Sequence, residues 1–252
     1  MNALETGIMV TLLLIGASLI GAGLSRRLPD HHLSVDSKEA IKLATAVVGT
    51  LSALAVGFLI ASAKTTFDTA QQELKTSAAR LVLLDRVMVQ YGDETKEARR
   101  QLTALVYARL NQTWGGLQET QHSADDDLGI EPVQRTLRAL VPHDDAQKLI
   151  RDRAIEVSGQ IAEAHWLVVE AGNEGLPTAF LVVLVFWLAL LFMTFGLLSP
   201  RNATVLCIVS VCAVSVGGAI FVINDMAHPY HGIIYVSDEP LRFALGRIDA
   251  TR

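Results

Sequence analysis

The feature that most limits how this chain folds is an uncharged, strongly apolar run from Leu176 to Leu198, LPTAFLVVLVFWLALLFMTFGLL. A bilayer core of about 30 Å is crossed by about 20 helical residues, so this run is long enough to span one. Because lipid offers no partner to backbone N–H and C=O groups, the segment must pair them internally. The run therefore predicts a transmembrane helix.

Three further uncharged runs predict three more spans, at about residues 7–24, 43–63 and 203–223. The composition agrees, since 51% of the residues are hydrophobic and soluble domains reach about 45–50% even with glycine counted. We expect two transmembrane hairpins. Residues 1–63 form the first, with a loop at 25–42, and residues 176–224 form the second.

The long segment between the hairpins, residues 64–175, predicts a soluble helical domain. Its first apolar residues recur at spacings of three and four, which is typical of one face of a helix: Leu74, Ala78, Leu81, Leu84 and Met88. Gly92 is expected to end this helix. The predicted fold is an all-α membrane protein with four transmembrane helices and a helical bundle between helices 2 and 3. Residues 225–252 are left as a C-terminal tail.

Basic residues orient the spans. The segment before the first run, MNALETG, has no Lys or Arg, whereas Arg26 and Arg27 follow the run. That order indicates a retained span rather than a signal peptide. The two short loops carry Arg26, Arg27, Lys38, Lys42 and Arg201. The positive-inside rule then predicts both loops in the cytoplasm of a bacterial inner membrane, with the helical domain periplasmic.

Two histidine-containing segments are candidate metal sites. His31 and His32 are adjacent, so their side chains point in different directions, which favours a titratable interfacial loop over a metal site. After the last span, NDMAHPYHG brings Asp225 near His228 and His231, where either a cation site or a proline turn is possible. The turn is favoured, and the sequence predicts no metal site and no cofactor.

Three charged residues are candidates for the mouth of a pore: Lys64, Asp68 and Asp225. All three flank predicted spans, and a carboxylate at a span end attracts cations.

Asp85 lies within LVLLDRVMV, on the apolar face of its helix. A charge that faces a core needs a partner. We expect a structural ion pair with Arg100 or Arg109 of the next helix; a catalytic carboxylate is the weaker alternative.

Small residues follow one side of the second span, and they fit two interpretations. Close helix packing is favoured, with Gly49 and Ala53 in this span and Ser215 and Gly218 in the fourth. Pore lining by small and hydroxyl groups is the other interpretation, with candidates Thr45, Thr50, Ser52 and Gly57. No ionisable residue lies within the core of a span, which disfavours proton-coupled pumps.

The sequence gives no positive case for an enzyme. It contains no nucleophile elbow, P-loop, dinucleotide fingerprint or HExxH motif. The net charge of −5 is mild and predicts no nucleic-acid partner.

Several stretches resemble the bestrophin-like family of bacterial membrane proteins, from about Gly7 to Leu245. They include LPDHHLSVDSKEAIKL, YGDETKEAR, PTAFLVVLVFWLALLFMTFGLLSPRNATV and SVGGAIFVI. The resemblance implies a relation to bestrophins, oligomeric anion channels with four spans and a large helical region between the second and third. Ala227 and His228 depart from the acidic residues and arginine of similar family members. The predicted periplasmic domain also departs from the cytoplasmic one of bestrophins.

Two functional hypotheses follow. The first is a homo-oligomeric ion channel, in which several copies of the chain assemble in membrane lipid and the second span lines a pore for small inorganic ions. An oligomer is required because four spans are too few to enclose a pore. The alternative is a membrane-anchored sensor or interaction scaffold that acts through its helical domain.

Overall fold

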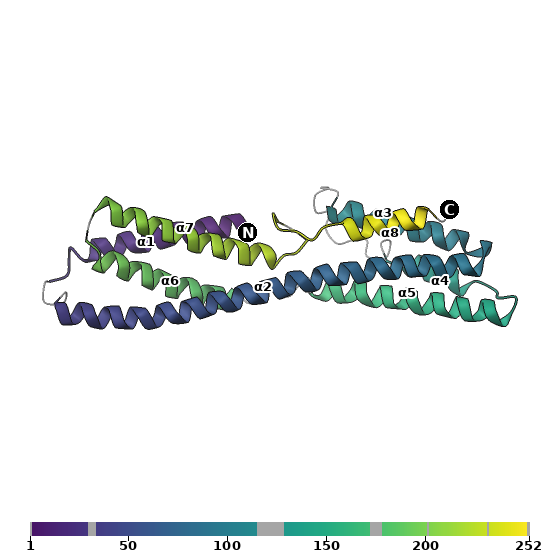
Figure 1. The fold of residues 1–252 in the computed structure, drawn as a ribbon, viewed down its shortest axis with the longest axis horizontal. Helices are drawn as coiled ribbons and strands as arrows, with labels where there is room; N and C mark the ends of the chain where they lie inside the picture. The colour runs from purple at the N-terminus through teal and green to yellow at the C-terminus, as the bar shows by residue number, and fades with distance from the viewer. Residues whose placement is uncertain are drawn as a thin grey trace. The chain divides into compact units, whose positions relative to one another are not determined.

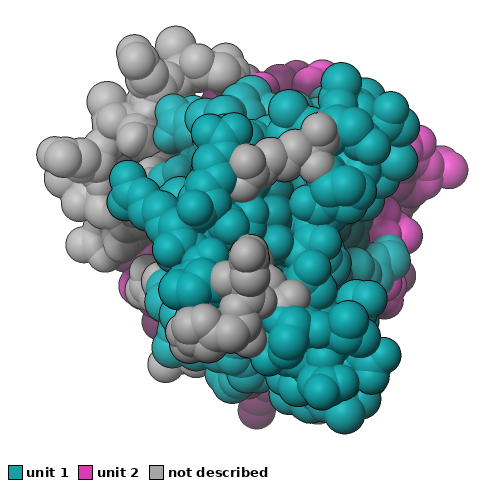
Figure 2. Space-filling model, turned by 90° about the vertical axis from the view of Figure 1, so that its left-hand side faces the viewer, with its two compact units in different colours: residues 1–67, 174–235 teal, residues 68–173, 236–252 magenta. Residues whose placement is uncertain are grey.

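The computed structural model describes residues 2–29, 34–114, 129–171, 178–200, 202–230 and 232–250, and every regular element in these ranges is helical. The chain forms two compact units, shown in different colours in Figure 2. Unit 1 comprises residues 1–67 and 174–235. Unit 2 comprises residues 68–173 and 236–252. The helix α2 (Val35–Tyr91) contributes residues to both.

Unit 1 contains α1 (Ala3–Leu24), the first part of α2, α6 (Thr178–Leu198) and α7 (Ala203–Met226) (Figure 1). Among the described residues, four helices are long and apolar enough to cross a membrane, and they coincide with the four predicted spans. α2 begins earlier than predicted, at Val35 inside the predicted loop 25–42. It then continues without a break to Tyr91, as the helical spacing up to Met88 and the expected stop at Gly92 had predicted.

The closest helix pairs in unit 1 are α1 with α6 and α1 with α7. These pairs join the first predicted hairpin to the second. On the α6 side, a Cβ at Gly21 would overlap the carbonyl oxygen of Met193, and a Cβ at Gly196 would overlap that of Ser18. Glycine therefore lets the two backbones touch, as in other tightly packed membrane helices.

Glycines also allow close packing between α1 and α7. A Cβ at Gly217 would overlap the hydroxyl of Thr11, and a Cβ at Gly7 would lie 2.8 Å from the Cβ of Phe221. Around these contacts lies the apolar core of unit 1, whose fully buried members include Leu14, Leu184, Ile220 and Ile223.

The residues predicted to pack helices do not make these close approaches within the chain. Ala53, Ser215 and Gly218 are exposed. A Cβ at Gly218 would meet no atom within 4 Å, and one at Gly49 would only touch Leu191 at 3.7 Å. The sequence signal was present in α1 as well, but small residues occur in every span, and spacing alone does not distinguish the ones that face a neighbour.

Unit 2 contains the rest of α2, the short 3-10 helix η2 (Asp93–Thr95), α3 (Lys96–Trp114), α4 (Glu131–Arg138), α5 (Asp145–Ala171) and α8 (Glu239–Asp249). The predicted apolar face of α2 is confirmed: Leu74, Ala78, Leu81, Leu84 and Met88 are all buried. Gly92 ends the helix as expected, with φ at +125°, a conformation that suits glycine.

α8 was not predicted, because residues 225–252 had been assigned to a tail. It packs against α3 and buries Leu241, Ala244 and Ile248. The indole Nε1 of Trp114 donates a hydrogen bond to the carbonyl oxygen of Val236 at 2.9 Å, which fixes the chain just before α8. The tail therefore completes the core of unit 2.

Candidate functional site

The membrane part of α2 is the least covered of the four spans. In its most apolar stretch 11% of the residues are buried, against 28% in α1 and 28% in α6. One face of α2 packs into the core of unit 1 through Ser52, Leu59 and Ala63. Val48, Ala55 and Val56 are partly buried against the same core, and most of the other residues of the span are exposed.

Two rows of residues make up this outward surface, each at the spacing of three and four that one helix face requires. The first row is small and consists of Ala46, Thr50, Ala53, Gly57 and Ala61, all exposed. The second row is large and apolar and consists of Leu43, Val47, Leu51, Leu54 and Phe58, which are 45–73% exposed. We call them the small row and the large row.

The four predicted pore-lining residues divide between two faces of α2. Thr50 and Gly57 lie together in the small row. Ser52 is only 2% exposed and faces the core, and Thr45, seven residues before it, is half-buried. The Thr50 hydroxyl donates to the carbonyl of Ala46 at 2.9 Å and keeps its acceptor lone pairs for an outside partner. Only Thr50 and Gly57 therefore have the exposure that pore lining requires.

The pore-mouth candidates Lys64 and Asp68 are exposed on α2. The ammonium of Lys64 lies 5.7 Å from the centre of the Phe67 ring, which is within the range of a cation–π contact.

Asp225, the third pore-mouth candidate, differs from the other two because its side chain is 2% exposed and lies inside unit 1. Its carboxylate accepts hydrogen bonds from the backbone N–H of Ile233 at 3.1 Å and of Ile234 at 2.7 Å. Gly232 has φ at +120°, and a Cβ there would overlap the carboxylate. The chain after α7 therefore folds back onto Asp225, a reversal that the aspartate alone did not reveal but Gly232 could have suggested.

The candidate metal ligands are only partly described. His31, His32 and His231 lie outside the described residues. His228 is exposed, and its Nδ1 lies 2.8 Å from the carbonyl oxygen of Asn224. Within the described ranges, no group of three or more His, Cys, Asp or Glu side chains is placed to hold a metal ion.

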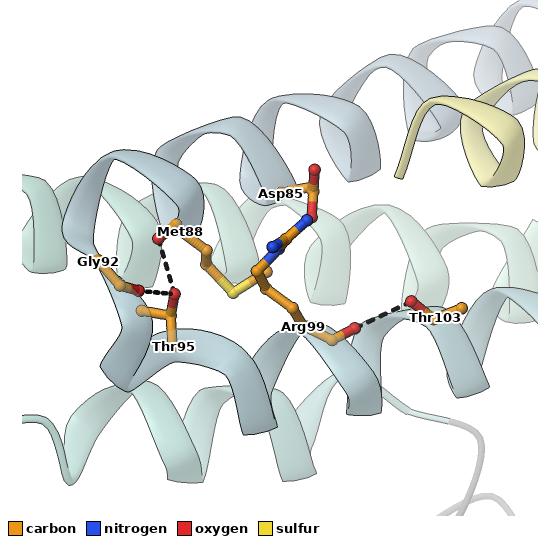
Figure 3. A network of polar contacts seen from close by, with 6 residues as sticks. All are labelled: Asp85, Met88, Gly92, Thr95, Arg99 and Thr103. Carbon is orange, nitrogen blue, oxygen red and sulfur yellow. Dashed lines mark hydrogen bonds and ion pairs between the residues drawn. The ribbon is translucent and has the colours of Figure 1, made fainter. Parts of the chain in front are cut away.

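The predicted ion pair of Asp85 exists, but its partner is Arg99 rather than Arg100 or Arg109 (Figure 3). The Nε of Arg99 lies 2.7 Å from Oδ1 of Asp85, whose side chain is 1% exposed. The alternative Arg100 instead pairs with Glu97 at the surface, at 3.6 Å. Which of two adjacent arginines faces α2 depends on the turn at Gly92 and η2, and that register was not evident from spacing.

Arg109, the other expected partner, is mostly buried in unit 2. Its Nε and Nη2 have no hydrogen-bond partner within the described part of the chain. Desolvation lowers the pKa of Arg109, and the negative charge of Glu131 opposes this effect.

A cavity of about 400 Å³ lies between α3 and α8 in unit 2. Tyr107, Asn111 and Trp114 line it from α3, and Arg242, Gly246 and Asp249 line it from α8. The size falls within the range of small-molecule pockets. The cavity bears on the sensor hypothesis, which requires a binding site in unit 2.

Known proteins share sequence and structural features with this chain. The family model described as the bestrophin-like domain matches residues 12–241. No curated protein sequence matches significantly.

Solved structures share the fold. A crystal structure described as a membrane protein has a TM-score of 0.67 at 12% identity, covering 97% of this chain and 98% of its own. Two variants of a bacterial bestrophin homolog from Klebsiella pneumoniae give TM-scores of 0.66 and 0.62, at 13% and 14% identity. They cover 98% and 97% of this chain, and 98% of their own chains.

Proposed function

Because this chain is a membrane protein that belongs to the bestrophin-like family, we propose that it forms a homo-oligomeric ion channel in which α2 lines the pore. The exposure of α2 is the observation that carries the proposal. A span that its own chain leaves mostly uncovered must face lipid, a second copy or an aqueous path. Copies related by rotational symmetry around a common axis can supply such a path.

Within α2, we assign the pore to the small row. Thr50 offers hydroxyl lone pairs, and Gly57 exposes backbone, so these positions present polar atoms to a permeating ion. The large row carries no polar side chain and suits contact with neighbouring copies or lipid tails. Lys64 and Asp68 stay assigned to the mouth.

The test is ion flux through purified protein in liposomes, with potassium and chloride gradients measured separately. Thr50→Trp places a large side chain in the small row, and we expect it to abolish flux with the oligomer intact on size-exclusion chromatography. Leu54→Trp is the matched control in the large row and should conduct. Loss of flux in Leu54→Trp alone would assign the pore to the large row. A monomer in mild detergent would contradict the channel.

We further propose that both short loops are cytoplasmic and that the protein lies in a bacterial inner membrane, from the basic residues of the 25–42 loop. The test uses a background with Cys207→Ala and Cys212→Ala and an impermeant thiol reagent on intact cells. A cysteine at Ser34 should be protected, and one at Val141, which is 77% exposed in unit 2, should react. The reverse labelling would contradict this orientation.

The cavity between α3 and α8 favours the alternative, a membrane-anchored sensor acting through unit 2. Measurement of ion flux distinguishes the channel from the sensor. A sensor predicts no conductance in any gradient and unchanged behaviour of Thr50→Trp.

A further inference from the structure

The segment that follows α7 presents large side chains outward although it lies outside any span. Ile233 is 68% exposed and Tyr235 is 56% exposed. Between them Ile234 turns the other way and is only partly exposed. Ile233 and Tyr235 therefore present apolar area on the outside of the chain just after α7.

The segment is held in place by Asp225. Its carboxylate accepts the N–H groups of Ile233 and Ile234 at 3.1 and 2.7 Å, and charged acceptors make the stronger class of such hydrogen bonds. Gly232 allows the reversal, since its φ of +120° is one that side chains with a Cβ rarely adopt. Residues 232–234 are therefore fixed against the last turn of α7.

This attachment sets the depth of the segment in the membrane. α7 runs from Ala203 to Met226 and is apolar enough to span a bilayer. Its exposed residues, which include Val214 and Val222, face away from the core of unit 1. Asp225 lies in its final turn, where a spanning helix reaches the headgroup region. A segment tied to that turn by the two hydrogen bonds of Asp225 lies near the same end of α7.

We propose that Ile233 and Tyr235 form an interfacial anchor that inserts into the boundary between headgroups and acyl chains. Tyrosine suits this level because its ring is apolar and its hydroxyl is polar, and such residues gather at both faces of a bilayer. Ile233 adds apolar area beside it. The partner is the lipid surface, and Asp225 is the positioning residue. The proposal depends on membrane insertion alone and not on ion conduction.

The test is site-directed spin labelling in phosphatidylcholine liposomes, in the background with Cys207→Ala and Cys212→Ala. Nitroxides are attached to Ile233→Cys or Tyr235→Cys, and collision rates with oxygen and with a water-soluble nickel complex are compared. Val214→Cys, near the middle of α7 and exposed, serves as the lipid control, and Val141→Cys in unit 2 as the water control. We expect the oxygen-to-nickel ratio at both anchor positions to lie between those of the two controls.

A ratio equal to that of Val141→Cys would overturn the proposal, because the segment would then face water. Shielding from both reagents would overturn it in favour of contact with another copy. A second variant tests the positioning role: adding Asp225→Ala to Ile233→Cys should mobilise the label and lower the ratio towards the water control. If the ratio and the spectrum stay unchanged, Asp225 does not set the depth. The single-cysteine measurements need no change at Asp225 and stand even if that variant fails to fold.

Discussion

α1 and α2 enter the membrane with the same mean hydropathy, 2.2 over their most apolar stretches, yet they occupy opposite positions in unit 1. α1 touches α6 and α7 through Gly21 and Gly7, whereas α2 leaves its glycine at position 57 with no atom near the missing side chain. Hydropathy governs insertion into lipid, but backbone-to-backbone approach governs packing. Two helices of equal apolarity can therefore serve as the centre of a unit and as its open face.

The largest test of this comparison is a side chain at each glycine. Gly21→Leu forces atoms into the carbonyl of Met193, which is rigid backbone, so we expect loss of the folded protein. Gly57→Leu meets open space within the chain and should leave the midpoint of thermal unfolding in detergent almost unchanged. Equal changes in the unfolding midpoint of the two variants would contradict the difference in packing between α1 and α2.

A second test concerns the C-terminal half of α2, whose apolar face is buried in unit 2. Asp85→Ala leaves the Arg99 guanidinium without its buried carboxylate, and removing one member of such a pair costs about 3–5 kcal/mol. Denaturant unfolding should show this loss for Asp85→Ala. Arg100→Ala, which removes only an exposed pair with Glu97, should show little change. If Asp85→Ala and Arg100→Ala lowered the free energy of unfolding equally, the burial of Asp85 would not explain its contribution to stability.

A third test concerns the end of α7. Asp225→Ala leaves the N–H groups of Ile233 and Ile234 without their acceptor, and hydrogen bonds to charged groups contribute about 1.5–3 kcal/mol each. We expect the free energy of unfolding to fall by about 3 kcal/mol, the lower limit for two such bonds. Asp68→Ala, at an exposed carboxylate of α2, is the matched control and should have a much smaller effect. A large effect at Asp68 would indicate a structural role that its exposure does not suggest.

The smallest expected effect is Gly57→Ala. Glycine in a helix interior is less favourable than alanine by about 1 kcal/mol, and no neighbour within the chain requires its absence of a Cβ. The substitution should leave folding unchanged or stabilise it by up to about 1 kcal/mol, measured by thermal unfolding. Destabilisation accompanied by loss of the oligomer would show that a second copy packs on the small row.

Much of the fold could be predicted because its signals are local. Uncharged runs gave the four spans, and spacing of three and four gave the buried face from Leu74 to Met88. The site could be predicted only in part. Thr50 and Ser52 look equivalent in the sequence, since both are hydroxyl residues in one apolar run. Their separation onto different faces depends on which side of α2 meets the core of unit 1.

The amino-acid sequence by itself determined that this chain is helical and that it is a membrane protein with four apolar helices, because apolar length and helical periodicity are properties of short segments. Only the tertiary structure decided that α1 is the packed centre, that Asp85 pairs with Arg99, and that Asp225 holds the chain after α7. Each of these depends on which surfaces meet in space, and neither a small residue nor a charge identifies its partner from sequence spacing alone.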